Sequence, residues 1–213
     1  MQRLLLALFV LMVFAGAAPP VTEEAVRAAL TPVGEIRIDV LKAMGPPVLP
    51  HLVRIYRDTA DENLRASYAW VFYKLGMKSP EARAALLRDI DTKNQKLRLQ
   101  VQWALGRVSD DTQVVDILAG IMRNDPNALF RDKAACALAY DQIHLTEKQK
   151  VQLFRKLIDG LSDEKAQVRG IAIQALSIHT GQSKGFDPNA AAEERGRAVA
   201  RWTAWLAEYE RNL

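Results

Sequence analysis

The sequence of 213 residues contains a single cysteine, Cys136. One cysteine excludes an intrachain disulfide framework, a four-cysteine zinc site and an iron–sulfur cluster. Glycine and proline are also sparse, with 11 and 9 residues, which excludes a collagen-like or low-complexity chain. Hydrophobic residues nevertheless make up 49% of the sequence, so the chain has enough apolar side chains to bury a core.

A strong excess of charge of one sign is also missing. The 29 lysines and arginines against 25 aspartates and glutamates give a net charge of +4. No stretch gathers the basic residues into the patch that a nucleic-acid-binding surface requires. We therefore expect no nucleic acid among the partners.

The sequence lacks the residue patterns of common enzymes. Its three histidines, His51, His144 and His179, are far apart, and none has a second histidine at metal-binding spacing. A glycine-rich phosphate loop and a serine nucleophile elbow are both missing. Cys136 stands among alanines and is expected to be an inert packed thiol. We predict that the chain is not an enzyme and holds no cofactor or metal.

One long hydrophobic run is present, at the N-terminus. Arg3 gives a positive start, residues 4–14 are apolar, and residues 15–17 (Ala-Gly-Ala) form a small-x-small cleavage pattern. Residues 1–17 are therefore predicted to be a secretory signal peptide, because the run is shorter than the ~20 residues that span a bilayer. The expected protein is exported, periplasmic or secreted, without membrane insertion after cleavage. The alternative is an uncleaved signal-anchor that tethers the protein to the membrane.

A repeated pattern centres on four arginines. Each follows an apolar residue and is followed by apolar residues three, six and seven positions later, which lie along one face of a helix. The arginines are Arg65, Arg98, Arg131 and Arg169. A register kept at four places indicates an internal repeat built on four amphipathic helices.

Another helix is predicted before each arginine helix. These segments are residues 47–56, 80–90, 111–122 and 146–158. Turns rich in Asp, Asn and Ser separate the two helices of each pair. An earlier, partial copy begins at Arg37, with Val40, Ala43 and Met44 at the same offsets. Because no segment alternates with a period of two, a sheet is not expected.

These helical pairs resemble HEAT repeats. Residues 168–176 (Val-Arg-x-x-Ala-x-x-Ala-Leu) and 101–106 (Val-x-x-Ala-Leu-Gly) are similar to the second helices of HEAT-like repeats of the phycobilisome-lyase type. Residues 45–47 (Gly-Pro-Pro) resemble the junction between units of such arrays. The resemblance implies an all-α, right-handed α-solenoid of helical hairpins, whose second helices line the concave face. It also implies that the four arginines join neighbouring repeats in a ladder with acidic residues.

The array is predicted over residues 18–180, followed by a linker and a capping helix over 181–213. The five units are approximately residues 22–45, 46–77, 78–109, 110–143 and 145–180. The capping helix is expected to be N-capped by Asp187 and to cover the last unit with Trp202 and Trp205. This tail resembles the one that closes HEAT-like arrays in exported bacterial proteins.

The second helices carry a stripe of positions that are expected to be exposed. The offsets one, five, eight and nine after each arginine point away from the core. The candidate partner-binding residues at these offsets are Trp70, Tyr73, Lys74, Leu99, Trp103, Arg107 and Tyr140. Tryptophan, tyrosine and arginine dominate interface energies, which favours a groove for an extended peptide or a partner helix. The alternative is that both tryptophans wedge between neighbouring repeats.

The combined pattern predicts a non-catalytic protein–protein interaction or scaffold module of the cell envelope. Its partner would be another protein or a peptide. One alternative is a lyase-like or chaperone-like accessory factor that acts on a cofactor-bearing protein. Another is an envelope structural protein held by an uncleaved N-terminal segment.

Overall fold

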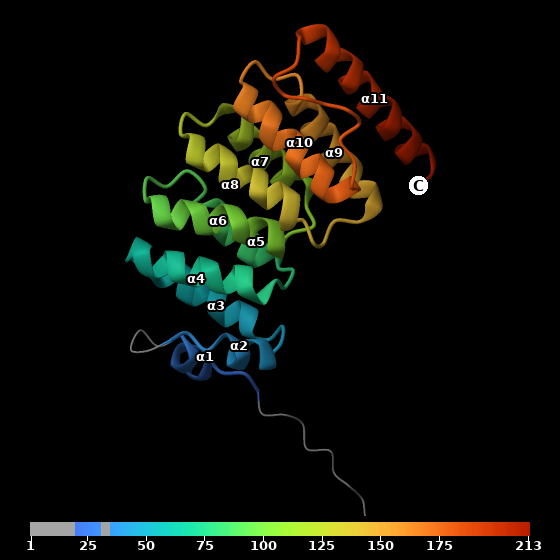
Figure 1. Cartoon of the computed structure of the whole chain (residues 1–213). Coiled ribbons are helices and arrows are strands. Elements are labelled where there is room, and N and C mark those ends of the chain that lie inside the picture. The colour runs from blue at the N-terminus through green and yellow to red at the C-terminus, as the bar shows by residue number, and fades with distance from the viewer. Residues whose placement is uncertain (1–19, 31–34) are drawn as a thin grey trace, which may run out of the picture.

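The computed structural model describes residues 20–30 and 35–213, so the predicted signal peptide lies outside the described residues. Within this part the chain is all α, as predicted, with eleven helices and no strand. The helices form two layers that rise together through the molecule (Figure 1). This arrangement is that of an α-solenoid, in which each unit adds one helix to each layer.

We call the layers first and second, after the order of their helices within a unit. The first layer consists of α1 (Glu23–Ala29), α3 (Val48–Asp58), α5 (Pro80–Leu87), α7 (Thr112–Asn124) and α9 (Glu147–Gly160). The second layer consists of α2 (Ile38–Ala43), α4 (Glu62–Leu75), α6 (Gln95–Val108), α8 (Ala128–Tyr140) and α10 (Ala166–Thr180). The last helix, α11 (Ala192–Arg211), packs against α9 and closes the array.

The register predicted around the four arginines is confirmed by burial. Each arginine is the fourth residue of its helix, α4, α6, α8 or α10. The residues three, six and seven positions later are all buried: Tyr68, Val71, Phe72, Val101, Ala104, Leu105, Ala134, Ala137, Leu138, Ala172, Ala175 and Leu176. Burial of each large apolar side chain contributes roughly 1.5–3 kcal/mol, so this face of the second layer builds a core that runs from unit to unit.

Side-chain caps begin six successive helices. From α4 to α9, an Asp, Ser, Asn or Thr before the helix accepts a hydrogen bond from a backbone N–H of the first turn. The caps are Asp61, Ser79, Asn94, Asp111, Asn127 and Thr146. Each such cap contributes about 0.5–2 kcal/mol, so the polar turns fix where each helix starts.

Three of the four arginines donate hydrogen bonds to the turn of their own helical hairpin. Nη1 of Arg65, Arg131 and Arg169 donates to the backbone carbonyls six and five positions earlier, at distances from 2.8 to 3.5 Å. Arg98 instead donates from Nε to the carbonyl of Ile90 at 3.0 Å. The guanidinium therefore supplies donors to carbonyls of the turn that the helical backbone leaves unpaired.

The same arginines also reach forward into the next unit. Arg65 contacts Asp89 at 3.1 Å, and Arg98 contacts Asp125, so the predicted acidic ladder is confirmed at two positions. At the next two positions the acceptor is not acidic. Arg131 donates to the side-chain oxygen of Gln167, and Nε of Arg169 donates to the carbonyl of Pro188 at 2.8 Å.

The partial copy at Arg37 differs from the other units. Arg37 is the residue before α2 rather than the fourth residue of the helix, and its Nη2 donates to the carbonyl of Ala28 at 3.1 Å. Because α2 starts later relative to the arginine, its buried face shifts and Leu41 replaces Val40 as the buried residue. The predicted offsets are therefore wrong in this unit.

The predicted start of the capping helix is also wrong, because α11 begins at Ala192. The Asp187 carboxylate accepts the backbone N–H of Asn189 at 2.8 Å and stabilises a turn instead of a helix. Trp202 is fully buried, and Trp205 packs edge-on against Phe154, with ring centroids 5.2 Å apart. The two tryptophans therefore cover the last unit, as predicted.

The linker after α8 reaches back across two units. Nε2 of His144 lies 2.9 Å from the carbonyl of Arg107, at the end of α6, and 3.0 Å from that of Gly76, at the end of α4. Gly106 allows this approach, because a Cβ there would lie 2.8 Å from Cβ of Asp141. The linker thereby joins the C-terminal ends of α4, α6 and α8.

Candidate partner-binding surface

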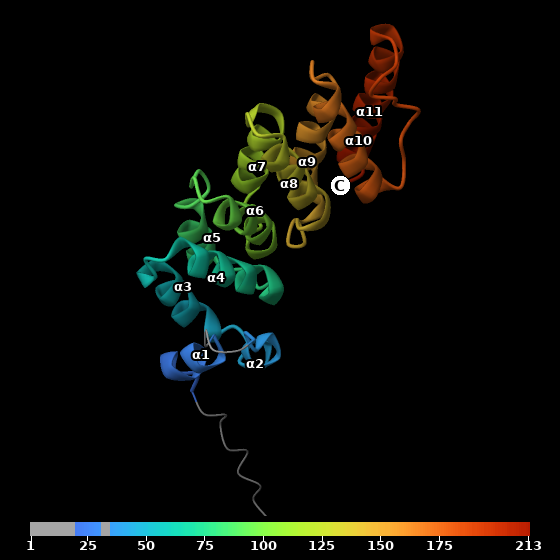
Figure 2. The same cartoon turned by 60° about the vertical axis from the view of Figure 1, so that its left-hand side comes forward.

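The predicted surface residues lie on the second-layer helices α4, α6 and α8. When the molecule is turned by 60°, α2, α4, α6, α8 and α10 follow the inner side of its bend (Figure 2). We call the surface that these five helices share the concave face. The chain exposes it over several units, so a partner could contact more than one repeat at a time.

Trp70 marks a hollow at the α2, α4 and α6 part of this face. Its indole is half-buried and packs against the core, and Nζ of Lys74 lies 5.6 Å from the ring centroid. A hollow of about 340 Å³ adjoins the ring. Its lining also includes Ile36, Ala66, Ser67, Lys96 and Gln100. Trp70 therefore borders a recess that is mostly apolar.

Tyr73 and Trp103 connect α4 to α6. Their ring centroids are 6.2 Å apart, and the guanidinium carbon of Arg107 lies 4.3 Å above the Tyr73 ring. Nε of Arg107 donates to the carboxylate of Asp141 at 2.8 Å. Burial raises the pKa of the Asp141 carboxyl, and the hydrogen bond from Arg107 opposes that shift. These contacts hold the aromatic and cationic groups in fixed positions before any partner binds.

Trp103 has the contact that the wedge interpretation predicts, with an aromatic ring of the neighbouring repeat. Trp70 and Trp103 are nevertheless only partly buried, and so is Leu99. Other positions at the predicted surface offsets are not exposed. Ala66 is fully buried, and Ala139 is nearly so. The repeats therefore do not all leave the same positions open.

Tyr140 belongs to a separate part of the concave face. Its side chain is 56% exposed, at the end of α8. A shallow hollow of about 60 Å³ lies between α8 and α10. Cys136, Tyr140, Ile171, Gln174 and Ile178 are among its lining residues. Ile178 is 38% exposed and stands nine positions after its arginine, an offset that could have identified it from sequence.

Cys136 is half-buried in this second hollow. Burial raises the pKa of its thiol, so the reactive thiolate is disfavoured at neutral pH. The thiol is less packed than predicted, because it lines a hollow. The side chain forms part of the apolar wall rather than a chemical centre.

The three histidines contact backbone carbonyls. Nε2 of His51 lies 3.1 Å from the carbonyl of Val21, and Nε2 of His179 lies 2.8 Å from that of Leu138. His144 has the two carbonyl contacts described above. Across residues 20–30 and 35–213, no three His, Cys, Asp or Glu side chains come together as metal ligands. The same ranges contain no helix with the length and apolar character needed to cross a membrane.

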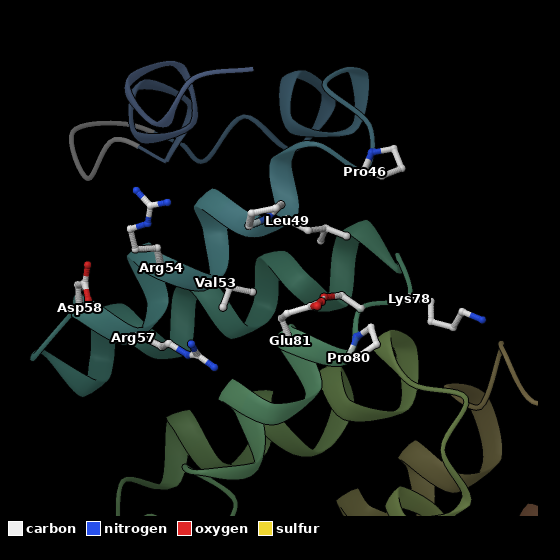
Figure 3. A pocket seen from close by; sticks show the side chains of 11 residues that line it. Pro46, Leu49, Val53, Arg54, Arg57, Asp58, Lys78, Pro80 and Glu81 are labelled. Atoms are coloured by element: carbon white, nitrogen blue, oxygen red, sulfur yellow. The ribbon is translucent and has the colours of Figure 1, made fainter. Parts of the chain in front are cut away.

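A larger hollow lies on the first layer, between α3 and α5 (Figure 3). It has a volume of about 670 Å³, with apolar Leu49 and Val53 among its lining residues. Two of the cations at its rim already have carboxylate partners in neighbouring units. Arg54 pairs with Glu23 and Lys78 pairs with Asp110, each at 2.9 Å. The rim therefore offers less unpaired charge than its composition suggests.

The fold and this extended surface define an α-solenoid with a concave face of mixed aromatic, cationic and aliphatic character. Residues 49–139 match the family model described as HEAT repeats. Residues 49–139 are therefore similar to HEAT repeats. HEAT repeats generally mediate protein–protein interaction, and proteins built from them are typically non-catalytic. A search of curated proteins gave no match.

Proposed function

We propose that this protein is a non-catalytic scaffold of the cell envelope that binds another protein or a peptide on its concave face. The observation that carries the proposal is the set of partly exposed side chains shared by α4, α6, α8 and α10. It includes Trp70, Trp103, Tyr140 and Ile178, all on one side of the array. Such residues supply much of the affinity in protein interfaces when a partner removes them from water.

Preorganisation supports a binding role. Tyr73 and Arg107 are already held by Trp103 and Asp141, so binding would immobilise few additional side chains. Each rotamer-rich side chain ordered on binding costs about 0.5–1.5 kcal/mol, and this surface avoids part of that cost. An extended surface also suits a peptide or a helix better than a small metabolite.

Site-specific photo-crosslinking tests the proposal. A photoreactive amino acid replaces Gln174, an exposed residue of the concave face, and in a matched variant it replaces Arg88, an exposed residue beyond α5. Irradiation in the native envelope should yield a discrete adduct from position 174 and none from position 88. The Trp70→Ala/Trp103→Ala variant should abolish the adduct while its circular dichroism stays helical. An adduct from position 88 alone would place binding on the other layer.

Export is a separate part of the proposal. The predicted signal peptide over residues 1–17 implies a mature chain that begins after Ala17. N-terminal sequencing of protein purified from the envelope fraction should identify that start. A chain that still begins at Met1 would instead support the membrane-tethered alternative.

A further inference from the structure

The charges of the concave face are unequal along its length. Lys74 of α4 and Lys96 of α6 are exposed, and neither has a carboxylate partner in the described part of the chain. The three arginines of α4 and α6, Arg65, Arg98 and Arg107, each pair with an aspartate. Two amines are therefore left uncompensated beside the half-buried ring of Trp70.

The α8 and α10 part of the face has a different character. Tyr140 and Ile178 are exposed, and Ile171 lines the hollow between the two helices. The charged pair on α8, Asp132 and Lys133, is internally compensated at 2.9 Å. Arg131 and Arg169 also lack a carboxylate partner, but they stand in the first turns of α8 and α10. The surface over the C-terminal halves of α8 and α10 is thus apolar and close to neutral.

We propose that the partner is a peptide segment with carboxylates at one end and aliphatic side chains at the other. This inference rests on the proposed function and adds the chemistry of the partner. The carboxylates would lie over α4 and α6, near Lys74 and Lys96, and the aliphatic side chains would lie over α8 and α10. Charge complementarity would fix the orientation of the segment, and burial of Tyr140 and Ile178 would supply apolar contact.

The dimensions of the face set the length of such a segment. Adjacent packed helices lie about 8–10 Å apart, so the three steps from α4 to α10 cover roughly 24–30 Å. An extended peptide rises about 3.3 Å per residue, so roughly eight or nine residues would span the distance. A basic peptide of the same length would bring its cations close to Lys74 and Lys96 and would be disfavoured.

Fluorescence anisotropy with labelled ten-residue peptides tests the proposal on the purified chain. The first peptide has four glutamates in one half and four leucines or isoleucines in the other. A second replaces the glutamates with lysines, and a third replaces the aliphatic residues with serines. The first peptide should bind at least about tenfold more tightly than either of the others, and its affinity should fall with added salt.

Variants assign the two ends of the peptide to the two parts of the face. Lys74→Glu/Lys96→Glu should weaken the acidic–aliphatic peptide about tenfold and reverse the preference toward the lysine peptide. Tyr140→Ser/Ile178→Ser should reduce its advantage over the serine peptide. Lys148→Glu, at an exposed position on α9, is the matched control and should leave both preferences unchanged. All these positions are exposed, so the variants should remain folded.

The outcomes separate this inference from the proposed function. Equal affinity for the three peptides would overturn the acidic–aliphatic partner, and so would preferences that the lysine variant does not change. A concave-face adduct from position 174 would leave the scaffold proposal standing in that case. Tighter binding of a single-stranded oligonucleotide than of any peptide would overturn the inference in favour of stacking on Trp70 and Trp103.

Discussion

Nε2 of His144 lies 3.0 Å from the carbonyl oxygen of Gly76, although the two residues are 68 positions apart in the sequence. In a solenoid each repeat usually contacts only its neighbours. Here the linker after α8 contacts the end of α4, two units earlier, as well as the end of α6. The three units that carry the predicted surface residues are therefore joined at their C-terminal ends.

Two glycines give opposite predictions for the same substitution. Gly106→Ala would place a Cβ 2.8 Å from Cβ of Asp141 and 3.1 Å from its carbonyl oxygen, so the linker would have to move. We expect a loss of about 1–3 kcal/mol in unfolding free energy, measured by urea denaturation. Gly120→Ala is the control, because no atom lies within 4 Å of the added methyl. It should stabilise α7 by up to about 1 kcal/mol. Equal effects of the two substitutions would contradict the close approach.

Gln102 is fully buried, and neither its side-chain oxygen nor its side-chain nitrogen has a hydrogen-bond partner among the described residues. A buried, unpaired amide costs roughly 1–3 kcal/mol. Gln102→Met keeps the shape of the side chain and removes the polar atoms, so the melting temperature should rise. Gln113→Met, at an exposed position, should leave it nearly unchanged. A fall in melting temperature for Gln102→Met would mean that the amide is satisfied in solution.

His179 should make stability depend on pH. Its imidazole is partly buried, and burial lowers its pKa below the usual 6.5. The unfolded chain then binds more protons than the folded chain between the two pKa values. The unfolding free energy should therefore fall as the pH drops through about 6.5 and level off below the folded pKa. His179→Gln, which retains a donor for the carbonyl of Leu138, should lose this part of the dependence. Parallel pH profiles of stability for the original protein and the His179→Gln variant would contradict this role of His179.

Two carboxylates of the inter-unit contacts should differ in their contribution to the free energy of unfolding. Asp125 has a side chain only 4% exposed and pairs with Arg98, which is 15% exposed. Removal of one partner from a buried pair leaves an uncompensated charge, so Asp125→Ala should cost about 3–5 kcal/mol. Asp110→Ala removes the partner of Lys78 from an exposed pair and should cost less than about 1 kcal/mol. Thermal denaturation of both variants measures the difference. Similar losses of stability would show that burial does not determine how much each ion pair contributes.

Local patterns predicted the parts of the fold that depend on helical periodicity. The spacing around Arg65 and Arg98 identified the buried face, because a helix repeats its orientation every 3.6 residues. The contact of His144 with Gly76 left no such signal, since two distant backbones meet only after the units have stacked. The start of α11 was mispredicted for a related reason, because Asp187 could cap a helix or a turn.

The candidate site likewise has features that helical spacing predicts and features that depend on contacts between distant segments. The offsets placed Trp70, Trp103 and Tyr140 on second-layer helices, as spacing alone allows. The fixed position of Arg107 depends on Asp141, which comes from a linker that no periodic pattern covers. The separation into a cationic part and an aliphatic part likewise depends on which neighbours compensate each charge.

The contacts that the four arginines make between units run in one direction along the chain. Each guanidinium binds an acceptor that lies later in the sequence, so each unit supplies the acceptor that the preceding unit lacks. During synthesis from the N-terminus, the last completed unit would thus hold an arginine whose later acceptor has not yet been made. The series ends at Pro188, whose backbone carbonyl accepts from Arg169. This acceptor lies in the tail and not in another repeat. The tail thereby supplies the last acceptor of the series.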